Sequence, residues 1–180
     1  LKQFKSHLSF KLHNHAMLYA AMCCGVFGLM RVGEFTLNND KRDEIDRLLT
    51  LKQITLYSSN QSIVSIHQHA SFHLVSCFTI QLNVSKTDPW RRGDTITIGN
   101  KEAIDAVLYY IRRFHPCSNM NGPLFQCLNG STLTRNLMVH HTKQLCQLSG
   151  YNAKHYNGHS FRRGGATALA EAGVPAKTIK

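Results

Sequence analysis

The sequence predicts an α+β fold that is mainly helical, with a small antiparallel sheet between helical segments. Three observations support this: helical spacing of apolar residues before Asn38, alternation of apolar and polar residues between Leu51 and Ile98, and helical spacing again after Lys101. Helices that flank a run of strands fit the α+β class. The 180 residues contain no internal repeat and no linker rich in Pro, Gly or Ser, so we expect one domain over residues 1–180.

Four longer helices are expected, each with apolar residues recurring at helical spacing: Leu12–Phe27, Lys101–Phe114, Thr134–Leu148 and Ser160–Ala172. Thr132 or Thr134 is the expected cap of the third, and Gly173 ends the fourth in a left-handed conformation. A short helical turn is expected at Val32–Leu37, and Val174-Pro175 should begin a new helix.

Short strands are expected between Leu51 and Ile98, where apolar residues alternate with polar ones. The apolar positions are Ile54, Leu56, Ile63, Val64, Ile66, Phe78, Ile80, Leu82, Val84, Ile96 and Ile98. Ser85–Asp94 contains Pro89 and Gly93 and should form the tip of a β-hairpin. The charged stretch Asn38–Arg47 is expected to be a solvated loop.

Charge favours a nucleic acid as partner. Lys and Arg number 21 against 10 Asp and Glu, a formal net charge of +11, and such a basic chain attracts polyanions. Hydrophobic residues make up 43%, too many for a disordered chain, yet no apolar run reaches the roughly 20 residues of a membrane helix. The six cysteines form no C-x-x-C pair, which argues against a zinc module and fits reduced, buried thiols in an intracellular protein.

The first of three basic motifs is Gly28–Phe35, directly after the apolar helix. Its Arg31 and Glu34 are three positions apart, so on a helical turn they can pair. A carboxylate that fixes a guanidinium suits a site in which the guanidinium meets a phosphate in one orientation. The alternative interpretation is a salt bridge that only stabilises a helix end.

The second motif is Lys86 on the predicted hairpin. A flexible ammonium on a β-turn can reach into a groove and exchange a proton near a phosphate. Arg91 and Arg92 beside it fit contacts to backbone phosphates. The alternative is a charged hairpin exposed to solvent.

The third motif is Gly158–Thr167, which reads GHSFRRGGAT. His159 and Arg162 are three positions apart at a helix start, where backbone amides also favour an anion. Small residues after Arg163 should let this helix approach its neighbours closely. A lone H-x-x-R is common, and the following Gly-Gly-Ala-Thr makes the match more specific.

In this order, with strands between the first and the third, the motifs resemble the catalytic domain of tyrosine recombinases, the integrase and Cre-like family. The sequences of the motifs are most similar to those of recombinases from eukaryotic transposable elements of the Crypton and DIRS types. The resemblance covers Leu12–Lys180. It implies that Arg31 and Arg162 are the two catalytic arginines, Lys86 the hairpin lysine and His159 the histidine of the H-x-x-R box. Glu34 would support Arg31, and the expected DNA contacts are Arg91, Arg92 and Arg163.

The resemblance implies that a tyrosine hydroxyl attacks a DNA phosphodiester and leaves a 3′-phosphotyrosyl link, which is later rejoined without cofactor or metal. The two guanidiniums would hold the non-bridging oxygens, where charge builds in the transition state. Lys86 would protonate the departing 5′ oxygen, and His159 would assist proton transfer or hydrogen-bond the phosphate. A two-metal nuclease, the competing hydrolytic interpretation, needs several converging carboxylates, and four of the ten crowd one loop.

The family places its attacking tyrosine a few tens of residues after the second arginine, whereas Lys180 lies 18 positions after Arg162. We therefore expect no nucleophile in these residues, and we expect the family's N-terminal DNA-clamping domain to be absent too. The chain alone should then not cleave DNA. The expected partner is double-stranded DNA, in the nucleus if the source is eukaryotic. The tetramer typical of the family depends on a C-terminal helix expected to be missing here.

Three alternatives remain at this stage. The first is a non-catalytic DNA-binding module that keeps the recombinase fold. The second is a basic RNA-associated helical protein, in which the motifs would lie far apart. The third concerns the less well matched segment Gln61–Cys77, where His67, His69 and His73 would fit either a solvated loop or, if His67 and His69 share one face of a strand, a metal site.

Overall fold

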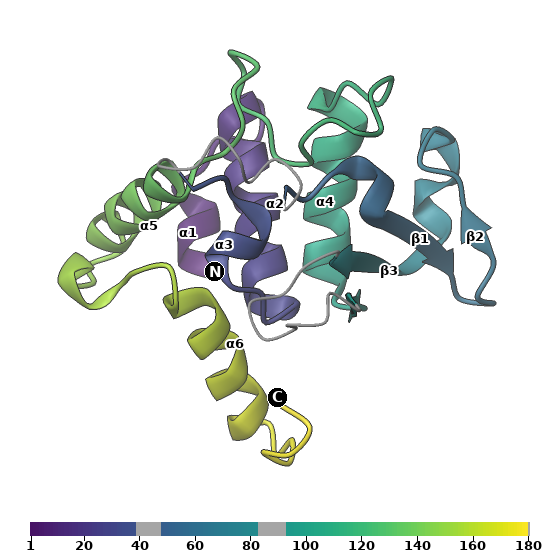
Figure 1. Cartoon of the computed structure of the whole chain (residues 1–180). Helices are drawn as coiled ribbons and strands as arrows, with labels where there is room; N and C mark the ends of the chain where they lie inside the picture. The colour runs from purple at the N-terminus through teal and green to yellow at the C-terminus, as the bar shows by residue number, and fades with distance from the viewer. Residues whose placement is uncertain (39–47, 83–92, 180) are drawn as a thin grey trace.

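The computed structural model describes residues 1–38, 48–82 and 93–179. Helix α2 (His13–Phe27) is the centre of the fold, with α4 (Lys101–Phe114) and α6 (Ser160–Glu171) packed against it (Figure 1). Every residue of α2 from Ala16 to Cys24 is buried. A helix that is apolar on all sides is stable only when its neighbours surround it, so this composition fixes α2 in the interior.

A four-stranded antiparallel sheet lies on the α4 side of the molecule (Figure 1). Its order is β2-β1-β3-β4, where β1 is Ile54–Ser58, β2 Ile63–Val64, β3 Val75–Leu82 and β4 Asp94–Ile98. Phe78, Ile80 and Leu82 are buried at alternate positions of β3, the pattern of a strand with one face on the core.

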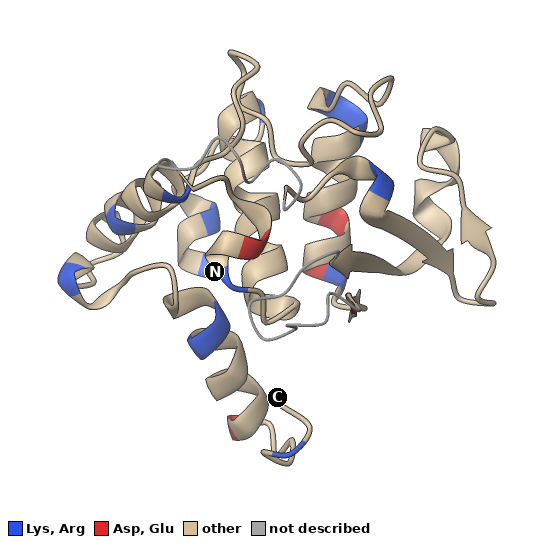
Figure 2. Ribbon diagram, in the orientation of Figure 1, with Lys and Arg blue, Asp and Glu red and all other residues tan. Residues whose placement is uncertain are grey.

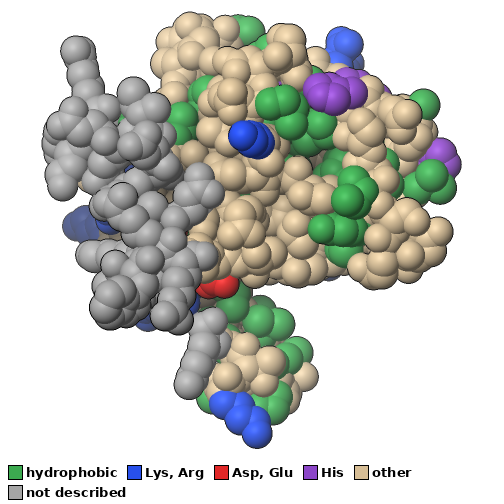
Figure 3. Space-filling view, turned by 45° about the vertical axis from the view of Figure 1, so that its right-hand side comes forward, with side chains coloured by type: hydrophobic (Ala, Val, Ile, Leu, Met, Phe, Trp, Pro, Cys, Tyr) green, Lys and Arg blue, Asp and Glu red, His purple; other side chains and the backbone are tan. Residues whose placement is uncertain are grey.

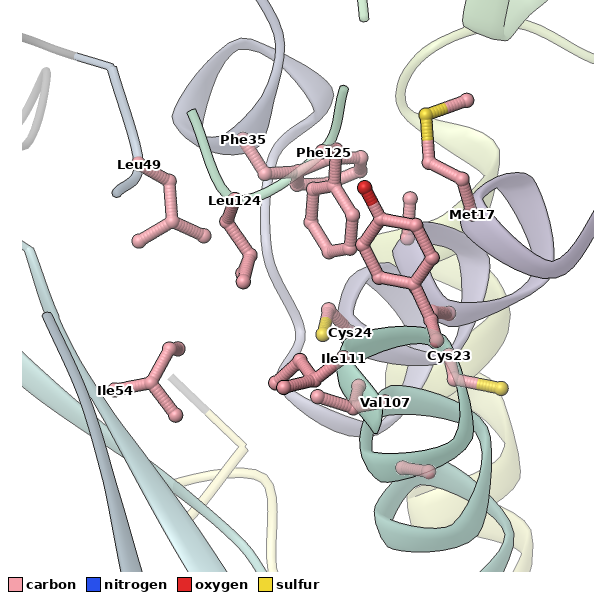
Figure 4. Close-up of a cluster of buried hydrophobic side chains, with 14 of the residues drawn as sticks. Met17, Cys23, Cys24, Phe35, Leu49, Ile54, Val107, Ile111, Leu124 and Phe125 are labelled. Carbon is pink, nitrogen blue, oxygen red and sulfur yellow. The ribbon is translucent and has the colours of Figure 1, made fainter. Parts of the chain in front are cut away.

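The core joins α2, α4 and the sheet through one continuous cluster of apolar side chains. Figure 4 shows Cys23 and Cys24 of α2 beside Val107 and Ile111 of α4, with Ile54 of β1 on the sheet side. Phe35 and Phe125 close the cluster edge to face, with ring centroids 6.0 Å apart. Segments distant in sequence are thus held in one packed unit.

The remaining helices lie around this core. They are α1 (Lys2–Ser6), α3 (Val32–Phe35), α5 (Arg135–Leu148) and the short 3-10 helices at Leu51–Gln53, His69–Leu74 and Ala153–His155. The Thr134 side chain accepts a hydrogen bond from the Leu137 amide at 3.2 Å, which makes Thr134, not Thr132, the cap of α5. In the described part of the chain, no helix is long and apolar enough to span a membrane.

The predicted fold class is confirmed, and the four longer helices begin and end within one residue of their expected bounds. Gly173 has a φ of +81° and closes α6 as expected. Three local predictions are wrong. Ile66 was expected in a strand, but β2 ends at Val64 and Ile66 lies in the turn that follows. Asp94 pairs with Leu82 as part of β4 and does not belong to the hairpin tip. Residues 174–179 form a turn, with the Thr178 amide donating to the Pro175 carbonyl at 2.8 Å, and not the start of a helix.

Of the expected buried thiols, Cys23, Cys24, Cys127 and Cys146 are buried, whereas Cys77 and Cys117 are partly exposed; all six are free. The predicted loop Asn38–Arg47 falls almost wholly outside the described residues.

Candidate DNA-binding and catalytic site

The turn between α2 and α3 sets the position of Arg31. Gly28 caps α2, and a Cβ there would lie 2.7 Å from the Cys24 carbonyl oxygen and 2.9 Å from Ile98 Cδ1, so only glycine fits. Leu29 follows with a φ of +50°, a left-handed conformation that costs a non-glycine residue about 1–2 kcal/mol. After this reversal Met30 is buried in the core, and Arg31 is the N-cap of α3.

Glu34 holds Arg31 at two points. Its carboxylate accepts one hydrogen bond from the Arg31 backbone amide at 2.8 Å and another from Nη1 at 3.0 Å. The Glu34 side chain is 10% exposed and the Arg31 side chain 29%. A half-buried carboxylate therefore orients a guanidinium that still reaches solvent, as the sequence predicted. The pair also stabilises the start of α3, so the alternative interpretation describes part of its role.

The third motif packs against the C-terminal half of α2. Phe161 is buried, and a Cβ on Gly25 of α2 would lie 3.0 Å from Phe161 Cβ. One turn on, a Cβ on Gly165 would overlap the Val26 carbonyl oxygen and lie 2.7 Å from Leu29 Cδ2. The small residues of this motif thus allow a close helix crossing, as predicted for Gly165, whereas Gly164 has open space beside it.

The first and third motifs meet at one point of the backbone. A Cβ on the buried Gly158 would lie 3.4 Å from Cβ of Val32, the residue after Arg31. His159, the next residue, is exposed and caps α6, and its amide is held by the Asn157 side chain at 2.9 Å. Arg162 is partly exposed and Arg163 exposed in the first turn of α6. The motifs are therefore neighbours in space although about 125 positions separate them along the chain.

Basic side chains gather where these elements meet. Figure 2 shows Lys and Arg at the starts of α3 and α5 and in the first turns of α6, with α3 packed against α5. Figure 3 turns the sheet side forward, and few of the described side chains on that face are Lys or Arg. Among the described residues, Arg31, Arg135, Arg162 and Arg163 thus lie in segments that meet at this junction, and cations so placed attract a polyanion.

Lys86, Arg91 and Arg92 lie outside the described residues. Their neighbours agree with the predicted hairpin, since β3 and β4 pair as far as Leu82 and Asp94. The assigned roles of these three residues stay predictions, as do those of Arg31, His159, Arg162 and Arg163.

The histidine-rich segment does not form the strand on which a metal site would depend. His69 and His73 belong to a 3-10 helix, and His73 Nδ1 lies 2.8 Å from the Ala70 carbonyl oxygen. Val64, Ile66 and Phe72 pack this segment against the core. Within the described ranges, no group of three or more His, Cys, Asp or Glu side chains is arranged to hold a metal ion.

One basic residue near the site was not singled out from the sequence. Arg135, the first residue of α5, places its Nε 3.6 Å from where a Gly158 Cβ would stand. A signal was available, because Arg135 directly follows the predicted cap Thr134. Its proximity to the other motifs depends on tertiary packing.

No model of a known protein family matches the sequence, and no curated protein matches it. Among solved structures, the chain is similar to the XerH site-specific recombinase in a pre-cleavage complex with its difH substrate. The TM-score is 0.65 and the sequence identity 17%, over 99% of this chain and 42% of the recombinase chain. This chain thus spans less than half the length of that recombinase.

The likeness shows that this chain has a tyrosine-recombinase-like fold. The finer resemblance to Crypton and DIRS elements stays a prediction.

Proposed function

We propose that this chain is the DNA-binding catalytic domain of a tyrosine-type site-specific recombinase. The observation that carries the proposal is the close approach of Gly158 to Val32, which brings the segments of Arg31 and Arg162 together in a recombinase-like fold. The positions of Arg31, Arg135 and Arg162 in the segments that meet there support it. A basic RNA-associated protein with unrelated motifs would not need this arrangement.

In the proposed reaction a tyrosine hydroxyl attacks a DNA phosphorus, a 3′-phosphotyrosyl bond forms and the 5′ oxygen leaves. Arg31 and Arg162 hold the non-bridging oxygens, and removing one such donor typically lowers the rate by about 10²–10³. Glu34 keeps Arg31 in one orientation. Lys86 supplies the proton for the 5′ oxygen, and His159 hydrogen-bonds the phosphate or moves a proton.

The bond energy stays in the protein–DNA link, so the proposed reaction uses neither metal nor nucleotide. The proposal places the attacking tyrosine after residue 180, by the family's order of motifs. It places the protein in the nucleus as part of a transposable element, acting as a tetramer when the family's C-terminal segment is present.

DNA binding is the first test. The 180-residue chain should bind duplex DNA with an affinity that falls steeply between about 50 and 200 mM salt, because each neutralised phosphate adds about 0.9 to the slope of log K against log salt. Fluorescence anisotropy with labelled duplex measures this. Binding that does not change with salt, or no binding, would contradict the proposal.

Covalent trapping separates the enzyme from the second candidate, a non-catalytic DNA-binding module. The longest natural chain that contains these residues is incubated with nicked suicide duplexes taken from the DNA that flanks its gene. The recombinase should form a protein–DNA adduct that is lost in Arg162→Ala. Salt-sensitive binding without any adduct would favour the binding module.

A further inference from the structure

Arg135 has a rigid backbone position beside the proposed site. Its amide donates to the Leu37 carbonyl at 2.9 Å, and the Leu37 amide donates to the Leu133 carbonyl at 3.0 Å. These bonds join the start of α5 to the chain that leaves α3. The backbone of Arg135 is therefore held by the segment that carries Arg31.

The Arg135 side chain extends toward the H-x-x-R box. Its Nε and Val32 Cβ both lie within 3.6 Å of the position that a Gly158 Cβ would take. The residues next in sequence to Val32 and Gly158 are Arg31 and His159. Arg135 therefore lies next to the point where the segment of Arg31 approaches the segment of His159 and Arg162.

Arg135 is also exposed, and the part of the chain that the structure describes offers it no acidic partner. No carboxylate in the described ranges lies within 4.0 Å of its guanidinium, whereas Arg31 pairs with Glu34 and Lys101 with Asp105. Since no described carboxylate neutralises it, the exposed Arg135 guanidinium can pair with a phosphate.

We propose that Arg135 is a further arginine of the DNA site and binds a backbone phosphate adjacent to the one held by Arg31 and Arg162. The inference rests on the proposed DNA-binding function. A planar guanidinium can donate two parallel hydrogen bonds to a phosphate, and such contacts fix the register of a protein on the duplex. Arg135 is accordingly a positioning residue and takes no part in proton transfer.

The test compares Arg135→Gln with the parent chain and with Arg113→Gln, an exposed arginine in the last turn of α4. Loss of one phosphate contact should weaken duplex binding about five- to tenfold and lower the salt slope by about 0.9. Arg113→Gln should stay within about twofold, and Arg135→Lys should recover part of the affinity because it keeps the charge. Circular dichroism of each variant checks that the helix content of the chain is unchanged.

The outcomes separate the two proposals. If Arg135→Gln binds like Arg113→Gln while the parent binds in a salt-sensitive way, the inference fails and the proposed function stands. If the parent does not bind DNA, the proposed function fails and the inference with it. An equal loss in Arg135→Gln and Arg135→Lys, with the salt slope unchanged, would also overturn the phosphate contact.

Discussion

The two arginines assigned to catalysis are fixed in different ways. Arg31 pairs with the Glu34 carboxylate and also donates its backbone amide to it, at the start of a helix of only four residues. Among the described residues, Arg162 has no carboxylate within 4.0 Å, and its position follows from how α6 packs on α2. Electrostatics orients the first guanidinium, and steric fit places the second.

This difference implies different vulnerabilities. Loss of charge at Glu34 should disturb the direction of one guanidinium and leave the fold nearly intact. Poorer packing between α6 and α2 should displace His159, Arg162 and Arg163 together, because all three lie at the start of α6. Three predictions test this contrast, and a fourth concerns a residue outside both regions.

Phe161→Ala should have the largest effect on stability. Phe161 is 4% exposed, and truncating a buried phenylalanine costs about 3–5 kcal/mol; the position at the edge of the core favours the lower figure. Urea unfolding followed by circular dichroism measures the loss. Phe161→Leu, which keeps most of the volume, should cost less than about 1.5 kcal/mol. Equal losses in the two variants would show that the volume of the Phe161 side chain does not hold α6 against α2.

Gly165→Ala should destabilise the fold by about 1–3 kcal/mol, although alanine is the better helix former, because its Cβ would overlap the Val26 carbonyl. The control is one residue away. Gly164 has no neighbour within 4 Å, so Gly164→Ala should stabilise the chain by about 0.5–1 kcal/mol. The opposite signs are measurable in one set of urea titrations, and two stabilising results would contradict the close crossing of α2 and α6.

Glu34→Gln should reduce stability by only about 1 kcal/mol, since the pair is partly exposed and glutamine can still accept the Arg31 amide. Its effect on adduct formation in the extended chain should be larger than this small loss suggests, because Arg31 loses its fixed orientation. Trapping assays at full DNA occupancy measure that. If Glu34→Gln forms the adduct at the parental rate, the ion pair has only a structural role.

The smallest effect is expected from pH, through a residue outside both regions. His115 is buried at the end of α4. Its Nε2 lies 3.0 Å from the Pro123 carbonyl oxygen, and its Nδ1 has no hydrogen-bond partner in the described structure. Burial lowers the pKa of His115 below its ordinary value of about 6.5. Below that pH the unfolded chain binds a proton that the folded chain excludes, so stability falls as pH falls.

Urea midpoints at about pH 7.5 and pH 5.5 should therefore differ, and His115→Gln should reduce the difference. Phe161→Leu should keep it, because His115 lies outside the α6 contact. A pH response that persists in full in His115→Gln would assign it to another histidine, such as His141, whose pKa burial also lowers.

Local patterns in the sequence were sufficient for most of the secondary structure. Helix bounds follow from apolar periodicity and from caps such as Thr134 and Gly173, and the Arg31–Glu34 pair follows from their spacing on one turn. Helix α1 was missed because its five residues carry little periodicity. The end of the hairpin was misjudged because Asp94 is a poor strand former that pairing with Leu82 nevertheless places in β4.

The site could be predicted only in part, because its assembly is a property of packing. Nothing local in the sequence shows that Gly158 lies against Val32, or that Arg135 lies at the same junction. The family resemblance predicts that the motifs of Arg31 and Arg162 lie close together, and the fold shows Gly158 close to Val32. The resemblance did not predict that Arg135 lies beside them.

The two adjacent free cysteines in the C-terminal half of α2 have a practical consequence. Cys23 and Cys24 are fully buried, and burial raises the pKa of Cys23 to about 12 and that of Cys24 further. Alkylating reagents react with thiolates, so these two cysteines should be modified only after α2 leaves the core, whereas Cys77 and Cys117 are partly accessible in the folded chain. The mass distribution after brief alkylation would therefore report the fraction of opened molecules without any added label.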